Sequence, residues 1–155
     1  INKEIYADAN GTLRATYGNV LGVSIKDGAF YKPFTTLEGI AEKHTGVNPF
    51  NVEKSLLNKI AEKDYGDYFF DYVGSVPVNF LSTLDITNGN SGSATINSNF
   101  ELVGLAFDGM IETIIADYKY IPQARTISVD SRYLLWTLDR VERAYNILDE
   151  LTIAD

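Results

Sequence analysis

The sequence predicts one domain of mostly β structure with helices, either all-β or α+β. Short segments rich in Val, Ile, Thr, Tyr and Phe recur between Gly, Asn and Pro residues, which is typical of strands joined by turns. Three longer segments instead repeat apolar residues at helical spacing. The 155 residues contain no internal repeat and no linker-like stretch, and they are enough for one hydrophobic core.

The first predicted element covers residues 8–25, "DANGTLRATYGNVLGVSI". An Asn-Gly turn opens this segment, and a second turn dipeptide, Gly18-Asn19, lies among β-prone residues. We expect a hairpin or two short strands here.

Two helices are predicted next. Residues 33–43, "PFTTLEGIAEK", begin a helix that Thr35 or Thr36 can cap. Residues 48–66, "NPFNVEKSLLNKIAEKDYG", predict a second helix that is capped near Asn51 and ends before the final glycine. The apolar stripe of this second helix consists of Val52, Leu56, Leu57 and Ile60.

The second half predicts further strands and a C-terminal helix. "SVPVNFLSTLD" (75–85) and "ARTISV" (124–129) are strands, and residues 93–107 form a hairpin of two buried strands. Residues 130–151 predict an amphipathic helix or helix pair with Asp130 as its N-cap. The side chains expected to face inward are Leu134, Leu135, Leu138, Val141 and Leu148.

Composition disfavours several function classes. The net charge of −8 argues against nucleic-acid binding, and the absence of cysteine removes disulfides, thiolate metal sites and a cysteine nucleophile. No apolar stretch approaches membrane-spanning length, and no metal-ligand or phosphate-loop spacing is present, so we expect no membrane contact, metal or cofactor. The chain starts at Ile1 without a signal-peptide pattern, so we expect an excised piece of a larger protein or a mature product.

The segment "TNGNSGSAT", residues 87–95, is the strongest candidate for chemistry. Acyl transfer needs a nucleophile such as Ser91, a base, and N–H donors for the developing oxyanion. Gly89 allows the backbone to turn its N–H inward beside that of Ser91. A polar hairpin turn without function is the alternative, and the nine residues alone favour it.

A longer comparison of motifs favours catalysis. "GNSGSATINSNFELVGLAFDG" resembles the serine segment of chymotrypsin-like proteases. Together with "PFTTLEG" and "RTISVDSRYLL", it resembles the C-terminal part of the bacterial dipeptidyl-peptidases of the dipeptidyl-peptidase 7 and 11 type, over nearly the whole chain. Two positions depart from the family pattern: Ala94 stands where Pro is usual, and Met110 to Glu112 replace an aromatic-containing run.

The resemblance implies a role for each of four residues. Ser91 is the nucleophile, and Gly89 and Ser91 give the oxyanion-hole N–H groups. Asp108 matches the residue that binds the free α-amino group of the substrate. Gly109 matches the residue that sets primary specificity, where glycine goes with apolar side chains. From the residues alone, Asp108 and Gly109 are more simply a turn aspartate and a turn glycine at a strand end.

The chain lacks an obvious partner for the serine. Its one histidine, His44, lies in "EKHTGVNP" and matches no catalytic block, so a solvated loop residue is the simpler interpretation. In the family, the catalytic histidine and aspartate belong to an N-terminal lobe. The candidate carboxylates in this chain, by presence only, are Asp64, Asp67, Asp71 and Asp85.

The resemblance therefore implies a chymotrypsin-like C-terminal β-barrel lobe, with flanking helices and a C-terminal helix, that forms part of a serine dipeptidyl-peptidase. Its partners would be peptides with a free N-terminus and the N-terminal lobe carrying His and Asp, in a periplasmic, surface or secreted parent that dimerises. We expect the isolated chain to be nearly inactive. The alternatives are a non-catalytic β-barrel interaction module, an endopeptidase of the same fold, and an active protease that uses His44.

Overall fold

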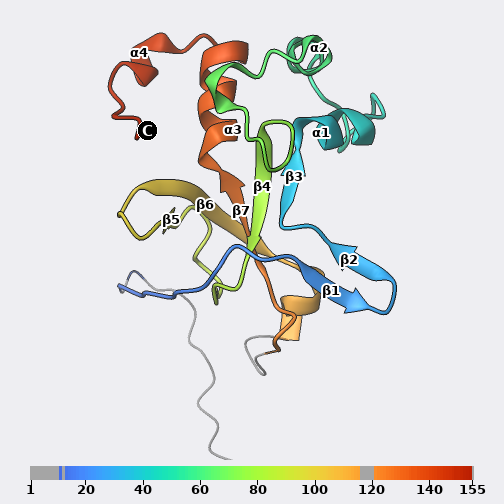
Figure 1. The fold of residues 1–155 in the computed structure, drawn as a ribbon, viewed down its shortest axis with the longest axis vertical. Helices are drawn as coiled ribbons and strands as arrows, with labels where there is room; N and C mark the ends of the chain where they lie inside the picture. Colours follow the sequence, from blue (N-terminus) through green and yellow to red (C-terminus); the bar gives the residue numbers. More distant parts are fainter. Residues whose placement is uncertain (1–10, 12, 116–120, 155) are drawn as a thin grey trace, which may run out of the picture.

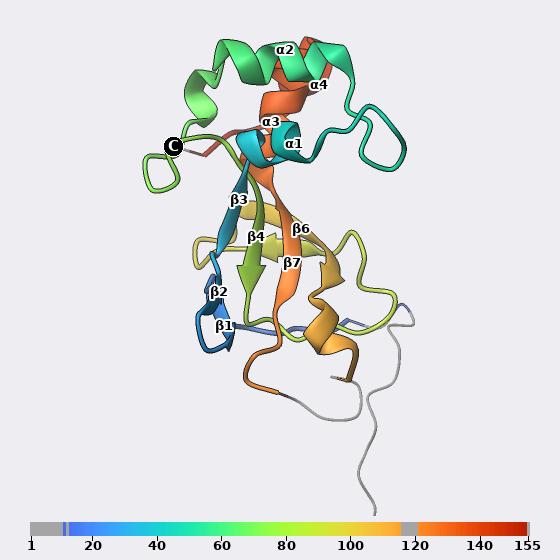
Figure 2. The same cartoon turned by 90° about the vertical axis from the view of Figure 1, so that its right-hand side faces the viewer.

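A five-stranded antiparallel sheet organises the computed structural model, which describes residues 11, 13–115 and 121–154. The strand order is β3-β4-β7-β6-β5. The α-helices gather at one end of this sheet, and the connections at the other end carry the candidate site (Figures 1 and 2). The strands are β3 (Phe34–Thr36), β4 (Pro77–Ser82), β5 (Ala94–Ile96), β6 (Leu102–Gly109) and β7 (Thr126–Asp130).

The predicted class, mostly β with helices, is confirmed in this mixed arrangement of a sheet and several helices. Within the described ranges the sheet is open, because its edge strands β3 and β5 each have only one strand neighbour. A closed β-barrel is therefore not seen in this part of the chain and remains a prediction. The hairpin predicted for residues 93–107 is present as β5 and β6. The prediction that both strands are buried is wrong for β5, because Ala94 and Ile96 are exposed on this edge strand.

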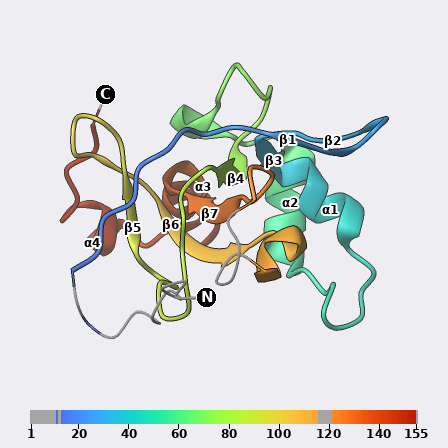
Figure 3. The same cartoon turned by 90° about the horizontal axis from the view of Figure 1, so that it is seen from below.

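The N-terminal hairpin lies later in the chain than predicted. Its strands are β1 (Val23–Lys26) and β2 (Ala29–Tyr31), and it projects beyond the sheet when the molecule is seen from below (Figure 3). Among residues 13–22, the structure has only an isolated bridge from Val20 to Ser82. Backbone hydrogen bonds from Leu21 N to Leu81 O, 3.0 Å, and from Thr83 N to Asn19 O, 3.0 Å, attach this segment to the end of β4. These long-range contacts replace the expected local hairpin, and Asn10 lies outside the described residues.

The two predicted helices are present as α1 (Leu37–Lys43) and α2 (Lys54–Glu62). Thr36 occupies the N-cap position of α1, although its side chain makes no capping hydrogen bond. The prediction of a cap near Asn51 is wrong, because Glu53 is the N-cap of α2. Glu53 has extended backbone angles, φ −63° and ψ 143°, so Asn51 lies outside the first turn of the helix. In this extended segment, Val52 N donates to His44 Nδ1 at 3.0 Å, which ties it to the end of α1. A 3-10 turn, η1 (Gly66–Tyr68), follows α2.

The C-terminal segment is a series of short helices, as the helix-pair prediction allowed. Asp130 is confirmed as the N-cap of α3 (Ser131–Trp136), because its carboxylate accepts from Arg132 N at 3.0 Å. A π-helical segment, η3 (Thr137–Val141), and α4 (Tyr145–Leu148) complete it. The five side chains predicted to face inward are half-buried, and Val141 among them packs against the core. The prediction missed Trp136, which is fully buried.

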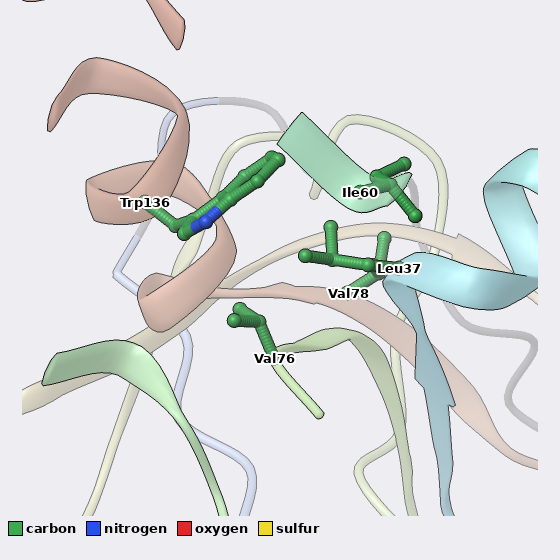
Figure 4. Packing of buried hydrophobic residues seen from close by; sticks show 5 residues of the cluster. All are labelled: Leu37, Ile60, Val76, Val78 and Trp136. Carbon is green, nitrogen blue, oxygen red and sulfur yellow. The ribbon is translucent and has the colours of Figure 1, made fainter. Parts of the chain in front are cut away.

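The hydrophobic core lies between the helices and the beginning of β4 (Figure 4). Trp136 of α3 packs there and donates its indole N–H to Asp64 O at 2.7 Å, so its one polar group is satisfied. The core therefore anchors the end of the sheet that is remote from the candidate site (Figure 1). Its buried members are Leu37, Ile60, Val76, Val78 and Trp136.

Candidate active site

Ser91 lies in a tight turn between β4 and β5, as predicted. Gly89 and Gly92 both have left-handed backbone angles, φ 92° and φ 88°, which glycine adopts without a Cβ penalty. Asn90 holds the turn together: its side-chain Oδ1 accepts from Thr87 N at 2.9 Å, and its carbonyl accepts from Ser93 N at 2.9 Å. The glycines and the asparagine thus fix a backbone that presents Ser91 to solvent.

The serine turn rests on β6 at a β-bulge. The register between β6 and β7 shifts between Ala106 and Asp108, so Phe107 is the extra residue. Gly92 N donates to Ala106 O at 2.7 Å, and the Ser91 hydroxyl donates to Phe107 O at 3.3 Å. The bulge therefore sets the position of the serine side chain.

The N–H groups of Gly89 and Ser91 are available to a ligand. Neither N–H has an acceptor among the residues that the structure describes, and both residues are exposed. Backbone donors that are fixed by a tight turn and remain unpaired are suited to binding an oxyanion. That the two N–H groups meet at one point stays a prediction.

Asp108 and Gly109 form the end of β6, two residues from the carbonyl that contacts the serine turn. They pair with Ile127 and Thr126 of β7. Gly109 N donates to Asp108 Oδ1 at 2.8 Å, which orients the carboxylate while its other oxygen stays open. Asp108 is exposed, so a substrate group can reach it.

One cavity joins the four residues singled out from the sequence. It has a volume of about 700 Å³, and Gly89, Ser91, Asp108 and Gly109 all line it. Apolar side chains of the same wall are Phe107, Met110, Ile111 and Ile114. Sequence motifs about 18 residues apart are thus brought to one hollow by the pairing of β5 with β6.

His44 lies far from this cavity. It is the C-cap residue of α1, at the opposite end of β4 from the turn that carries Ser91 (Figures 1 and 2). Its Nδ1 accepts from Val52 N, and it does not line the cavity. His44 is the only histidine of the chain, and the structure does not bring it to the cavity that contains Ser91.

Of the candidate carboxylates, Asp85 lies at the cavity and Asp64 lies away from it. Asp64 pairs with Lys59 at 3.0 Å and with Arg140 at 3.7 Å, in a surface network beside α2. Asp85 lines the cavity and is half-buried.

The sequence interpretation missed Arg125, which is only 6% exposed and also lines the cavity. Two of its hydrogen-bond acceptors, Leu21 O and Gly22 O, are about 100 residues away in the sequence, so no local pattern indicates these contacts.

Within the part of the chain that the structure describes, no group of three or more His, Cys, Asp or Glu side chains could hold a metal ion. In the same part of the chain, no helix is both long and apolar enough to cross a membrane.

The sequence and the fold both match those of known peptidases. The Peptidase S46 family profile matches residues 1–153, and the chain belongs to this family.

Relatives within the family carry dipeptidyl-peptidase names. The chain is 42% identical to an Asp/Glu-specific dipeptidyl-peptidase of Shewanella putrefaciens, over 98% of this chain and 24% of that protein. It is 45% identical to a dipeptidyl-peptidase 7 of Phocaeicola vulgatus, over 96% of this chain and 21% of that protein. The chain therefore spans about a quarter or less of the length of these relatives.

A solved structure confirms the fold. The structure of Porphyromonas endodontalis DPP11 in complex with the dipeptide Arg-Glu superimposes with a TM-score of 0.84 at 38% identity. The match covers 87% of this chain and 20% of DPP11.

Proposed function

We propose that this chain supplies the nucleophile half of the active site of a serine dipeptidyl-peptidase, which releases dipeptides from peptide N-termini. The observation that carries the proposal is the single cavity shared by an exposed serine, unpaired N–H groups and an accessible carboxylate. The dipeptidyl-peptidase names of the relatives agree with it.

The chemistry assigned to Ser91 is nucleophilic attack on the scissile carbonyl. The hydroxyl must leave Phe107 O, which it contacts weakly at 3.3 Å, and donate its proton to a base. The N–H groups of Gly89 and Ser91 then stabilise the oxyanion, each contributing about 3 kcal/mol. Because His44 lies at the other end of β4, the base comes from outside these residues, from a lobe that carries His and Asp.

Asp108 explains how the enzyme measures two residues from the N-terminus. A carboxylate fixed in the same cavity as the nucleophile can accept hydrogen bonds from a substrate ammonium. Only a peptide whose second peptide bond then reaches Ser91 is cut there. An endopeptidase of the same fold would not need this carboxylate.

Gly109 and its neighbours favour an apolar side chain before the cut. Glycine at position 109 leaves the cavity open and uncharged at this point, and Met110, Ile111 and Ile114 supply apolar surface. The relatives bear both kinds of name, dipeptidyl-peptidase 7 and Asp/Glu-specific dipeptidyl-peptidase, so family membership alone does not choose between apolar and acidic side chains.

The proposal extends to the whole peptidase. It acts on peptides with a free N-terminus, in the periplasm or at the cell surface, and it forms a homodimer. Cell fractionation and light scattering of the full-length protein test the location and the dimer separately.

The test of function is covalent labelling of the full-length peptidase by a dipeptidyl phosphonate ester with a free amino group. We expect mass spectrometry to find the label on Ser91, and hydrolysis of dipeptidyl substrates to stop in proportion to labelling. Labelling of another residue would refute the role of Ser91. Absence of both labelling and hydrolysis in a folded full-length protein would favour the non-catalytic module.

A further inference from the structure

We infer that Arg125 is a positioning residue that holds the wall of the substrate cavity in shape. This inference rests on the proposed function of the cavity and adds a residue to it. Arg125 lies directly before β7. Together with its neighbours Ala124 and Thr126, it lines the cavity that contains Ser91.

The guanidinium group of Arg125 connects two stretches of backbone. Nε donates to Leu21 O at 3.1 Å, and Nη2 donates to Gly22 O at 3.2 Å. Nη1 donates to Pro122 O at 2.8 Å and to Ala124 O at 2.6 Å. One side chain therefore attaches the segment before β1 to the loop that precedes β7, across about 100 residues of sequence.

Backbone and neighbouring contacts extend this anchoring to the rest of the wall. Met110 N donates to Arg125 O at 3.0 Å, which fixes the residue that follows Gly109. The Thr126 hydroxyl donates to Leu84 O at 2.7 Å, which fixes the chain leading to the serine turn. Two other residues that line the cavity, Met110 and Leu84, are thus held by hydrogen bonds to residues 125 and 126.

The Arg125 side chain donates its hydrogen bonds to backbone carbonyls rather than to a carboxylate. Within the described part of the chain it forms no ion pair, although its side chain is almost wholly buried. A buried guanidinium is expensive to desolvate unless most of its donors are satisfied, and five donors in a rigid fork suit several carbonyls at once. Substitution by a neutral side chain would remove the donors from the buried Gly22 carbonyl and from the partly buried contacts to Leu21, Pro122 and Ala124, and the wall would relax.

The predicted consequence is a change in substrate binding more than in the chemical step. Ser91 and its turn depend on β6 through Ala106 O and Phe107 O, not on Arg125. We therefore expect Arg125→Gln to raise KM for a substrate with a large apolar side chain before the cut by roughly ten-fold, with kcat within about three-fold. The ratio of kcat/KM for that substrate to kcat/KM for a substrate with alanine should fall by a similar factor. The KM and this ratio for Arg125→Lys should lie between those of the wild type and Arg125→Gln.

The experiment compares full-length wild type, Arg125→Gln, Arg125→Lys and Arg140→Gln on free dipeptidyl substrates with leucine or alanine before the cut. Arg140 is a matched control, because it belongs to the Asp64 network beside α2 and does not line the cavity. Arg140→Gln should leave KM and the leucine-to-alanine preference unchanged.

Several outcomes would overturn the inference. A lower kcat at unchanged KM and unchanged preference, together with lower thermal stability, would show that Arg125 only supports the fold. Unaltered kinetics would show that it has no role in the cavity. If Arg125→Gln does not fold, the same comparison of KM, kcat and preference in Arg125→Lys decides. Failure of the wild type to hydrolyse either substrate would contradict the proposed function instead.

Discussion

At the scale of single residues, Asp108 is the group whose role is easiest to isolate. The hydrogen bond that we propose between its carboxylate and a substrate ammonium is charge-assisted and would contribute about 1.5–3 kcal/mol. In the full-length enzyme, Asp108→Asn should therefore lower kcat/KM on free dipeptidyl substrates by about ten- to a hundred-fold. Thermal unfolding should be unchanged, because the side chain is exposed.

N-acylated substrates supply the control for Asp108. Acylation removes the substrate ammonium, so it should lower kcat/KM of the wild type by about the same factor as Asp108→Asn does. The two losses should not add, because both remove one interaction. Equal rates on free and acylated substrates, or a silent Asp108→Asn, would point to an endopeptidase.

Gly109 offers a second residue-scale prediction, about the side chain before the cut. Gly109→Arg would place a guanidinium in the cavity, so preference should move from apolar toward Asp and Glu side chains. Gly109→Ala, which adds bulk without charge, should lower activity on large side chains without creating a preference for acids. A panel of dipeptidyl substrates measures both variants, and an unchanged preference in Gly109→Arg would remove position 109 from the specificity site.

Residues in local motifs could be predicted from the sequence, and residues that act over long range could not. Gly89, Ser91, Asp108 and Gly109 lie in two short motifs, and the structure brings all four to one cavity. Arg125 opens the motif "RTISVDSRYLL", but the motif does not indicate its role, because its partners Leu21 and Gly22 are 104 and 103 positions away. The sequence likewise could not reveal that the Ser91 hydroxyl contacts the bulge carbonyl of Phe107.

At the scale of elements, the cap of α3 joins the sheet to the C-terminal helices. Asp130 is 1% exposed, and its carboxylate accepts from Arg132 N at 3.0 Å and from Arg132 Nη2 at 2.8 Å. The Arg132 guanidinium also lies 4.1 Å from the centre of the Phe70 ring. Asp130→Ala should reduce the free energy of unfolding by about 2 kcal/mol in urea titration, through loss of the cap and of this partner.

The matched variant for that element is Asp130→Asn, which keeps an oxygen acceptor for the cap but removes the charge. Because the Arg132 side chain is 33% exposed and can be solvated, this variant should lose less, about 1 kcal/mol. Equal losses in the two variants would contradict a capping role.

A second element-scale prediction concerns the contact between α1 and the segment after α2. The Tyr65 hydroxyl donates to Glu38 Oε1 at 2.6 Å. Burial acts to raise the pKa of Glu38, but hydrogen bonds, chiefly from Tyr65, outweigh it and leave the pKa below its usual value of 4.5. Burial and the contact with Glu38 both raise the pKa of Tyr65 above its usual value of 10.0.

These two directions define a pH window. A lowered carboxylate pKa stabilises the fold above the unfolded value and is lost as pH falls through the folded value. A raised tyrosine pKa stabilises below its unfolded value and is lost as pH rises through the folded one. Tyr65→Phe should therefore cost about 1 kcal/mol near pH 7, and the difference from wild type should shrink at acidic pH. Urea unfolding at several pH values measures it, and a difference independent of pH down to strong acid would contradict the assignment.

Elements with strong local signals were predictable, and those set by tertiary contacts were not. Asp130 caps α3 as its sequence indicates. Asn51 does not cap α2, because the chain stays extended through Glu53, where the segment is also bound by His44 through Val52 N. Gly18-Asn19 does not make a hairpin, because residues 19 and 21 pair with the end of β4.

At the scale of the whole molecule, the core and the cavity occupy opposite ends of the sheet. The helices bury Trp136, Leu37 and Val76 completely at one end, while the serine turn at the other end faces solvent. The sequence predicted the class of fold but not this division, because strand order and the side of each helix follow from long-range pairing. One consequence is that changes in the helical core should alter stability before they alter the geometry around Ser91.

Because His44 lies at the helical end and Ser91 at the other, we propose that Ser91 is a nucleophile whose base lies outside these 155 residues. The most direct test measures hydrolysis of a free dipeptidyl-chromophore by this chain, with and without the remaining part of the full-length peptidase. The account predicts no turnover above background by the chain alone, restoration when the wild-type chain is combined with the remainder, and no restoration with Ser91→Ala. Turnover by the chain alone that Ser91→Ala abolishes would contradict it and would point to a base within the chain, such as His44.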